Sequence, residues 1–197
     1  RRQMTIRAAL LGATFLAFAG QAFAADCDEI SFSDVGWTDI TVTTSATKHV
    51  LEALGYSVEL QVLAVPVTFA ALESDDVDVF LGNWMPAQAA DLRPYREDGS
   101  VEVVGANLDG AKYTLAVPAY LYEAGLRDFS DIRRYATELK HEIYGIEPGN
   151  DGNRLVLTLI KEDAFWLGDF KLVESSEQGM LAQVERRDGA ANDGSAH

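Results

Sequence analysis

The sequence is poor in the residues that build catalytic and metal-binding sites. Among its 197 residues there is one cysteine, Cys27, and the three histidines, His49, His141 and His197, show no metal-ligand spacing. A G-x-S-x-G elbow is absent, and the glycine-rich stretch PGNDGN at 148–153 lacks the Gly-Lys-Ser/Thr of a phosphate-binding loop. The sequence therefore predicts no catalytic residue, no metal ligand and no cofactor, and it argues against an enzyme.

Positive charge is also scarce. The chain has 16 Lys and Arg against 31 Asp and Glu, which gives a formal net charge of -15 at pH 7. An acidic surface of this kind repels nucleic acid and anionic membranes, so neither is expected as a partner. The charge alone says nothing specific about a small ligand.

Long apolar runs are confined to the start of the chain. Arg1, Arg2 and Arg7 accompany the run AALLGATFLAFAG, and Ala-Phe-Ala at 22–24 has the small-x-small pattern of a cleavage site. These features predict a secretory signal peptide over residues 1–24, which is too short for a membrane span. We therefore expect a mature chain that begins near Ala25 and works outside the cytoplasm.

The remainder alternates short apolar segments with amphipathic ones. Strands are predicted at 29–34, 58–65, 77–82, 100–105, 111–117, 142–146 and 170–174. Helices are predicted at 38–54, 67–74, 86–98, 128–140, 154–164 and 176–187. Because the β-α-β-α-β order recurs on both sides of 105–110, the sequence predicts two α/β lobes with parallel strands. We place lobe 1 at 25–108, lobe 2 at 109–187 and a small, polar tail at 188–197.

Aromatic and polar side chains fall where several of these strands end, which is where open parallel sheets bind ligands. Trp37 and Asp39 follow the first strand, Trp84 follows the third, Asn150 follows a strand of lobe 2, and Tyr113 opens that lobe. Each has a structural explanation of its own, as a core ring, a residue of a first helical turn or a helix cap. Glycine followed closely by tryptophan at two strand exits favours one shared aromatic cleft.

An aromatic cleft suits a quaternary ammonium ion. Such a cation has no N–H group to donate, so the faces of aromatic rings must hold it, at about 0.5 to 2 kcal/mol for each ring. Several rings together reach the roughly 8 kcal/mol of micromolar binding. A nearby carboxylate such as Asp39 favours a cation over a zwitterion, whose own carboxylate it would repel.

Six stretches carry a resemblance to a known family: SFSDVGWTDI, LGNWMP, REDGSVEVV, GAKYTLAV, YGIEPGNDGNR and VESSEQGMLAQV. They resemble the substrate-binding proteins of glycine betaine/choline ABC transporters, most closely the choline-binding members, from about residue 26 to residue 184. The resemblance implies a type II periplasmic binding protein fold, in which a monomer closes on its ligand between two lobes. It also implies that the protein works in the periplasm and delivers choline to a membrane permease.

By this resemblance, Trp37, Trp84 and Tyr113 wall an aromatic box around the trimethylammonium group, and Asp39 and Asn150 address the hydroxyl end of choline. Glycine betaine or another betaine is the alternative ligand. A ligand-sensing module or an enzyme of the same fold is a remoter alternative, and a sensor would need an output domain or a membrane span.

The sequence departs from the family after LAQV, where family members continue through further strands that add another tryptophan to the box. Here a polar run leads to His197, which suggests a truncation or frameshift near Glu185. By the resemblance, the partner of Cys27 would lie in the absent region, and the first lobe would lack part of its sheet. Trp166 is expected in the core and does not replace the missing wall. We therefore expect weak choline binding or none, against micromolar binding by a longer version.

Overall fold

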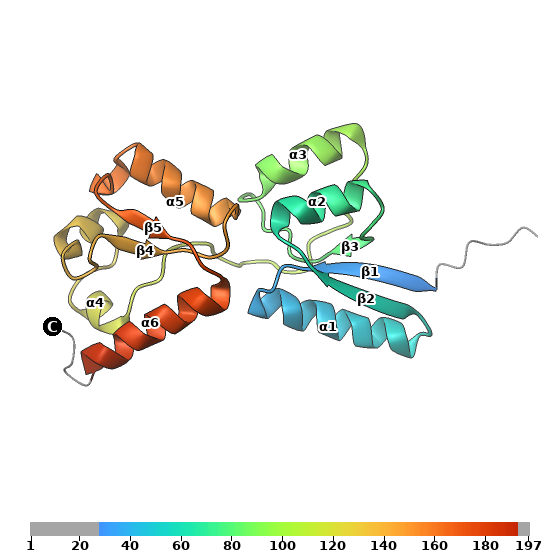
Figure 1. Cartoon of the computed structure of the whole chain (residues 1–197), viewed down its shortest axis with the longest axis horizontal. Coiled ribbons are helices and arrows are strands. Elements are labelled where there is room, and N and C mark those ends of the chain that lie inside the picture. The colour runs from blue at the N-terminus through green and yellow to red at the C-terminus, as the bar shows by residue number, and fades with distance from the viewer. Residues whose placement is uncertain (1–27, 193–197) are drawn as a thin grey trace, which may run out of the picture.

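The computed structural model describes residues 28–192. The predicted signal peptide at 1–24, Cys27 and residues 193–197 lie outside the described residues. The described chain folds into two lobes, each with a parallel sheet and flanking helices (Figure 1). The predicted α/β fold is therefore confirmed. Within 28–192, no helix is both long and apolar enough to cross a membrane.

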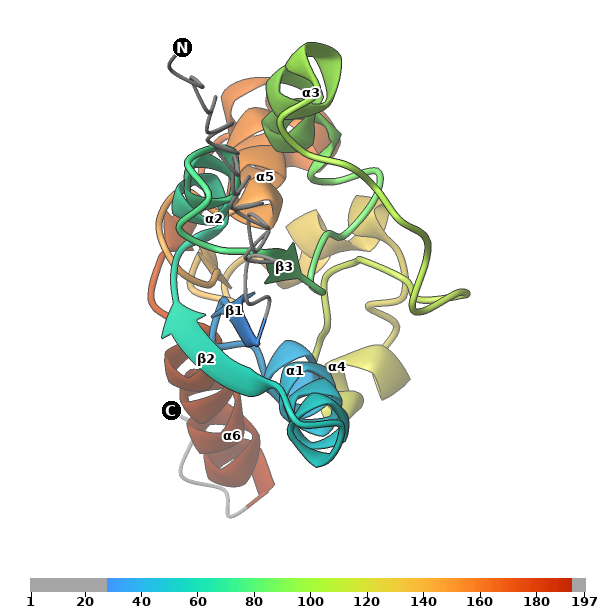
Figure 2. The same cartoon turned by 90° about the vertical axis from the view of Figure 1, so that its right-hand side faces the viewer.

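The first lobe contains a three-stranded parallel sheet in the order β2-β1-β3. Its strands are β1 (Glu29–Asp34), β2 (Ser57–Val62) and β3 (Val79–Phe80), and its helices are α1 (Thr38–Ala53), α2 (Val65–Glu73) and α3 (Ala89–Asp98). Figures 1 and 2 show α1 on one face of this sheet and α2 and α3 on the other. Because the strands are parallel, their carboxyl ends meet at one edge, and the loops after β1 and β3 lie together there.

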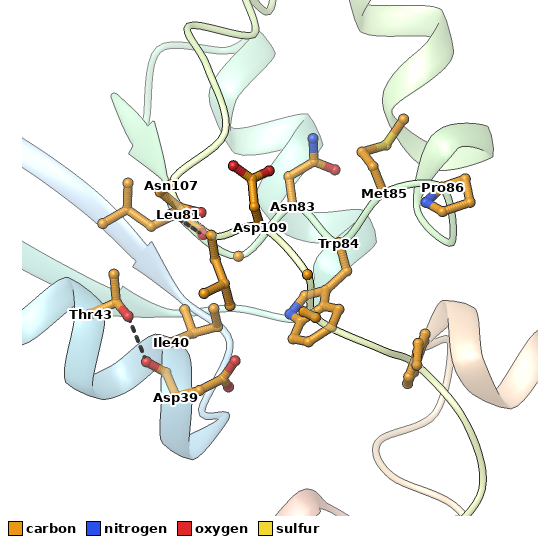
Figure 3. Close-up of a pocket in the computed structure, with 15 residues that line it drawn as sticks. Asp39, Ile40, Thr43, Leu81, Asn83, Trp84, Met85, Pro86, Asn107 and Asp109 are labelled. Atoms are coloured by element: carbon orange, nitrogen blue, oxygen red, sulfur yellow. Dashed lines mark hydrogen bonds between the residues drawn. The ribbon is translucent and has the colours of Figure 1, made fainter.

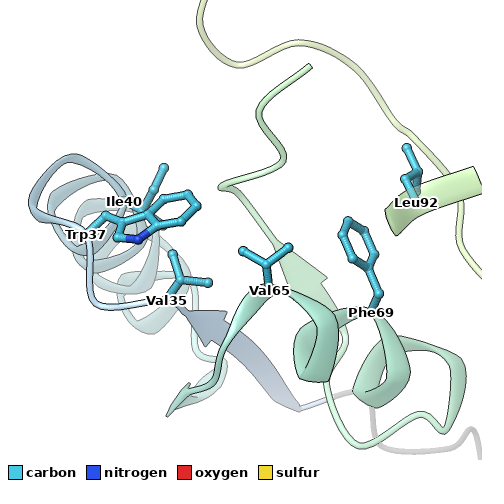
Figure 4. Packing of buried hydrophobic residues seen from close by; sticks show 6 residues of the cluster. All are labelled: Val35, Trp37, Ile40, Val65, Phe69 and Leu92. Atoms are coloured by element: carbon cyan, nitrogen blue, oxygen red, sulfur yellow. The ribbon is translucent and has the colours of Figure 1, made fainter. Parts of the chain in front are cut away.

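The core of the first lobe gathers at this edge (Figure 4). Its buried members are Val35, Trp37, Ile40, Val65, Phe69 and Leu92. Phe69 stacks on Tyr95 with ring centroids 5.8 Å apart and meets Phe80 edge-on at 6.0 Å. Each large apolar side chain buried in this way contributes about 1.5 to 3 kcal/mol, so the cluster fixes the strand exits in place.

The second lobe contains the parallel pair β4 (Glu142–Tyr144) and β5 (Lys171–Val173). Its helices are α4 (Ala119–Glu123), α5 (Asp151–Lys161) and α6 (Glu177–Asn192), with 3-10 turns at Phe129–Tyr135 and Ala164–Trp166. In Figure 1, α5 lies above the two strands and α6 below them. A separate core packs inside this lobe and consists of Leu121, Leu126, Ile132, Leu167 and Phe170.

Two predicted strands, at 100–105 and 111–117, are wrong, because neither segment pairs into a sheet. In the first, Val104 is fully exposed and has no face to bury. In the second, residues 113–117 line one side of an open apolar cavity of about 580 Å³, which β4 lines as well. An alternating pattern makes a strand only when a neighbouring strand takes up its backbone hydrogen bonds, and within 28–192 this segment has none.

Other elements of the second lobe also differ from prediction. The helix expected at 128–140 is a 3-10 turn opened by a capping box of Asp128 and Asp131, and α4 was not predicted. α6 continues past residue 187 to Asn192, through part of the predicted polar tail. Trp166 was expected in the core but is 56% exposed; its backbone is left-handed (φ 60), and the Arg133 guanidinium covers its ring at 4.2 Å from the centroid.

Several polar contacts join the two lobes. Glu177 accepts hydrogen bonds from the backbone N–H and the hydroxyl of Thr38, both at 2.7 Å. Gln178 donates to the Gly36 carbonyl at 2.7 Å. Arg154 at the start of α5 forms an ion pair with Asp91 on α3. The start of α6 therefore contacts the first lobe at the loop after β1.

Candidate ligand-binding site

An open pocket of about 480 Å³ lies at the carboxyl edge of the first sheet (Figure 3). The start of α1, the loop after β3 and the segment leading into the second lobe build its walls. Three of the five predicted site residues line it: Asp39, Trp84 and Tyr113. The other two, Trp37 and Asn150, lie outside its lining.

Trp84 reaches the pocket because of how the chain leaves β3. A side chain at Gly82 would place a Cβ 2.8 Å from the Phe80 ring and 3.1 Å from Ile40, so only glycine fits at this turn. The buried Gln88 amide then donates to the Gly82 carbonyl at 3.2 Å and holds the loop. The indole of Trp84 is half-buried against the first core and presents its remaining surface to the pocket.

Trp84 and Tyr113 form the aromatic part of the pocket. Their ring centroids are 5.8 Å apart and their planes are inclined by 44°. Tyr113 is 50% exposed, and its hydroxyl donates to Asn150 Oδ1 at 3.2 Å. Two tilted rings at this spacing can present their faces to one small cation between or beside them.

The Tyr113 phenol is held in its neutral form. Burial, reinforced by the negative charges of Asp151 and Glu147, raises the pKa of Tyr113 to about 12. The phenol can approach α5 closely because residue 152 is glycine, and a Cβ there would collide with the Tyr113 hydroxyl. A neutral phenol keeps its proton as a hydrogen-bond donor to Asn150.

Asn150 lies behind the pocket wall. It is the N-cap of α5, its Oδ1 accepts from the Gly152 N–H at 2.7 Å, and its side chain is 1% exposed. Its Nδ2 donates to Glu147 Oε1 at 3.0 Å. In this structure Asn150 therefore supports Tyr113 and caps a helix, and its predicted contact with a ligand hydroxyl remains a prediction.

Trp37 also lies behind the pocket, in the core of the first lobe, where it is 7% exposed (Figure 4). Its Nε1 donates across the lobe boundary to Glu147 Oε1 at 3.0 Å. Glu147 was not predicted as a site residue. An acidic residue directly before the Pro-Gly turn at a strand exit was the available signal, and its link to Trp37 depends on the tertiary fold.

The polar part of the pocket is acidic. Asp39 lies exposed in the first turn of α1 and lines the pocket, and Asp109 lines it too. Asn107 secures the segment that carries Asp109 by donating to the Leu81 carbonyl at 2.9 Å. Two carboxylates beside two ring faces give a negative potential that suits a cation. Asp109 was not predicted, because nothing in its sequence context marks a pocket.

The residues that line the pocket are suited to binding a cation. Within the described part of the chain, no group of three His, Cys, Asp or Glu residues is arranged to hold a metal ion. Ring faces and carboxylates attract a cation and offer a hydrogen-bond acceptor to a polar end group.

The chain is similar to proteins of known structure. A solved structure described as an ABC-transporter choline binding protein in complex with choline is 57% identical, with a TM-score of 0.79 over 85% of this chain. This chain spans 57% of the length of that protein. Uncharacterized protein ORF1 from Chromohalobacter salexigens is 52% identical over 134 residues, which cover 68% of this chain and 86% of that protein.

A second curated relative is the glycine betaine/carnitine transport binding protein GbuC from Listeria monocytogenes. It is 31% identical over 97 residues, which cover 49% of this chain and 32% of that protein. The family model that describes the substrate binding domain of ABC-type glycine betaine transport systems (OpuAC) matches residues 28–193. The chain therefore belongs to the OpuAC family of substrate-binding domains.

Proposed function

We propose that this chain binds choline as the periplasmic solute-binding component of an ABC transporter and presents it to a membrane permease. The observation that carries the proposal is the pair of Trp84 and Tyr113 with Asp39 around one open pocket. The 57% identity to a protein solved with choline supports the same ligand. In this proposal the two rings hold the trimethylammonium group and Asp39 faces the cation. Trp37 and Asn150 act from behind the pocket wall.

The lining predicts the strength of binding. Two ring faces contribute about 1 to 4 kcal/mol together. A millimolar dissociation constant corresponds to about 4 kcal/mol and a micromolar one to about 8 kcal/mol. At the upper end of that range, with Asp39 facing the cation, we expect this chain to bind choline in the millimolar range, because the pocket is open and only two rings of the described residues line it.

Glycine betaine is the second candidate, favoured by the similarity to the Listeria protein. Its quaternary ammonium group fits the same rings. Its carboxylate, however, would enter a pocket that Asp39 and Asp109 already make negative. Like charges close together disfavour binding, so choline is expected to bind more tightly than glycine betaine.

The lobe boundaries and the cellular location of this chain are part of the same proposal. We place lobe 1 at 25–108 and lobe 2 at 109–187, since the first sheet lies within 29–80 and the second within 142–173. The predicted signal peptide at 1–24 would deliver the chain to the periplasm.

Titration calorimetry with choline and glycine betaine tests the proposal. Wild-type protein is expected to bind choline, and Trp84→Ala to weaken binding by about 2- to 30-fold, the value of one ring face. Trp166→Ala is the matched control, because that indole is exposed at the second lobe, away from the pocket lining. Absence of choline binding at tens of millimolar, or tighter binding of glycine betaine, would contradict the proposal.

A further inference from the structure

Glu147 occupies an unusual position between the lobes. It follows β4 in the second lobe, and its side chain is partly buried. One of its oxygens, Oε1, accepts two hydrogen bonds, from Trp37 Nε1 in the first lobe and from Asn150 Nδ2 in the second, each at 3.0 Å. A single carboxylate oxygen therefore joins the core of one lobe to the helix cap of the other.

Each of these bonds leads to a ring or to its support. The bond to Asn150 orients that amide so that Oδ1 faces the Tyr113 hydroxyl. Tyr113 in turn contacts Trp84, which packs against the core that contains Trp37. These contacts lead from Trp37 in the first lobe through Glu147 and Asn150 to Tyr113, which in turn contacts Trp84 in the first lobe. Glu147 is the residue that joins the two lobes in this series.

We propose that Glu147 is a positioning residue for the pocket, which sets the Tyr113 ring against Trp84 by fixing the Trp37 indole and the Asn150 amide together. The inference rests on the proposed function for its ligand, but the hydrogen bonds that carry it involve only this chain. Glu147 itself lies outside the pocket lining, so it acts through the residues it holds.

The backbone around Glu147 is held independently of its side chain. Asn153 donates to the carbonyls of Ile146 and Glu147, both at 3.1 Å, and accepts from the Ile146 N–H at 3.1 Å. Removing the carboxylate should therefore leave the turn in place. This separates a positioning role from a general contribution to folding.

Two substitutions distinguish positioning from a simple effect of charge. Glu147→Gln retains an oxygen that can accept both bonds and removes the negative charge, because Oε2 takes part in neither bond. Glu147→Ala removes both bonds. We expect Glu147→Gln to bind choline within about threefold of wild type and Glu147→Ala to bind about tenfold more weakly. Glu123→Ala, at an exposed glutamate ending α4, is the control and should bind as wild type does.

A readout without ligand keeps this inference separate from the proposed function. In the wild type and in Glu147→Gln, the Trp37 indole N–H should exchange slowly with solvent by NMR, with Trp37→Phe used to assign its resonance. In Glu147→Ala that exchange should accelerate at least tenfold, while the urea midpoint changes little. If Glu147→Ala does not fold, Glu147→Asp takes its place, since the shorter side chain cannot reach both donors.

Different outcomes test the proposed ligand and the positioning role of Glu147. If no variant binds choline but the indole exchange responds as described, the proposed ligand is wrong and the positioning role stands. If Glu147→Ala leaves the indole exchange and choline binding unchanged, the positioning role is overturned. Equal losses of affinity in Glu147→Gln and Glu147→Ala would overturn it as well, because they would assign the effect to charge.

Discussion

At the scale of single residues, Tyr113 illustrates how a ring is prepared for a cation. Its hydroxyl is committed to Asn150, and its pKa lies at about 12 because burial and two neighbouring carboxylates disfavour the phenolate. A phenolate would attract a cation more strongly, but the raised pKa keeps the phenol of Tyr113 protonated, so that it donates to Asn150. The face of the Tyr113 ring is the surface that is available to a cation in the pocket.

The raised pKa gives a testable titration. Because the neutral phenol is favoured in the folded state, its contribution to stability is fully present below about pH 10 and is lost as the pH rises towards about 12. Ultraviolet difference titration should show a tyrosine that ionises near pH 12, and Tyr113→Phe should remove that component. If Tyr113→Phe instead removed a component near pH 10, the effect assigned to burial and to the charges of Asp151 and Glu147 would be wrong.

The site residues were predicted with unequal success, for identifiable reasons. Asp39, Trp84 and Tyr113 line one pocket because strand exits bring them to one edge, which sequence order can indicate. The burial of Trp37 depends on side chains from α2 and α3, which the local sequence around it does not specify. Glu147 was missed because its partner in the first lobe, Trp37, lies far away in the sequence.

At the scale of elements, the first turn of α5 connects the helix to the pocket. Asn150 caps the helix through Gly152, accepts from Tyr113 and donates to Glu147. One side chain therefore terminates a helix and supports a pocket wall.

Two substitutions at Asn150 separate these tasks. Asn150→Ala removes the cap and should lower the free energy of unfolding by about 0.5 to 2 kcal/mol. Asn150→Asp retains the capping oxygen but places a carboxylate against Glu147, so it should lose ligand affinity more than it loses cap strength. Urea unfolding and calorimetry on both variants test this. Unchanged stability in Asn150→Ala would contradict the capping role.

Helices and strands could be predicted where the pairing partner of each strand is itself a predicted strand. The order β1-α1-β2-α2-β3 was predicted, and each of its strands finds a partner within it, because β1 pairs with both β2 and β3. The segment at 111–117 has a strand pattern, yet it faces a cavity rather than a strand. Sequence periodicity reports which side chains alternate and does not report whether a neighbouring strand is present.

At the scale of the whole molecule, the first lobe makes most of the pocket, and the start of the second lobe adds Asp109 and Tyr113 to its lining. The polar bridges from Glu147, Glu177 and Gln178 all reach residues 36–38. The loop after β1 is thus held by both lobes. The affinity for a ligand that contacts both Asp39 and Tyr113 would therefore depend on how the two lobes are arranged.

Contact between the methyl groups of choline and the rings of Trp84 and Tyr113 is the central feature of the proposed binding mode. The direct measurement is intermolecular NOE spectroscopy at saturating choline, with the two rings assigned through Trp84→Phe and Tyr113→Phe. We predict NOEs from the choline methyl protons to both rings, together with an upfield shift of the methyl resonance from ring currents. NOEs to rings elsewhere, or none at a concentration where calorimetry records binding, would contradict the account.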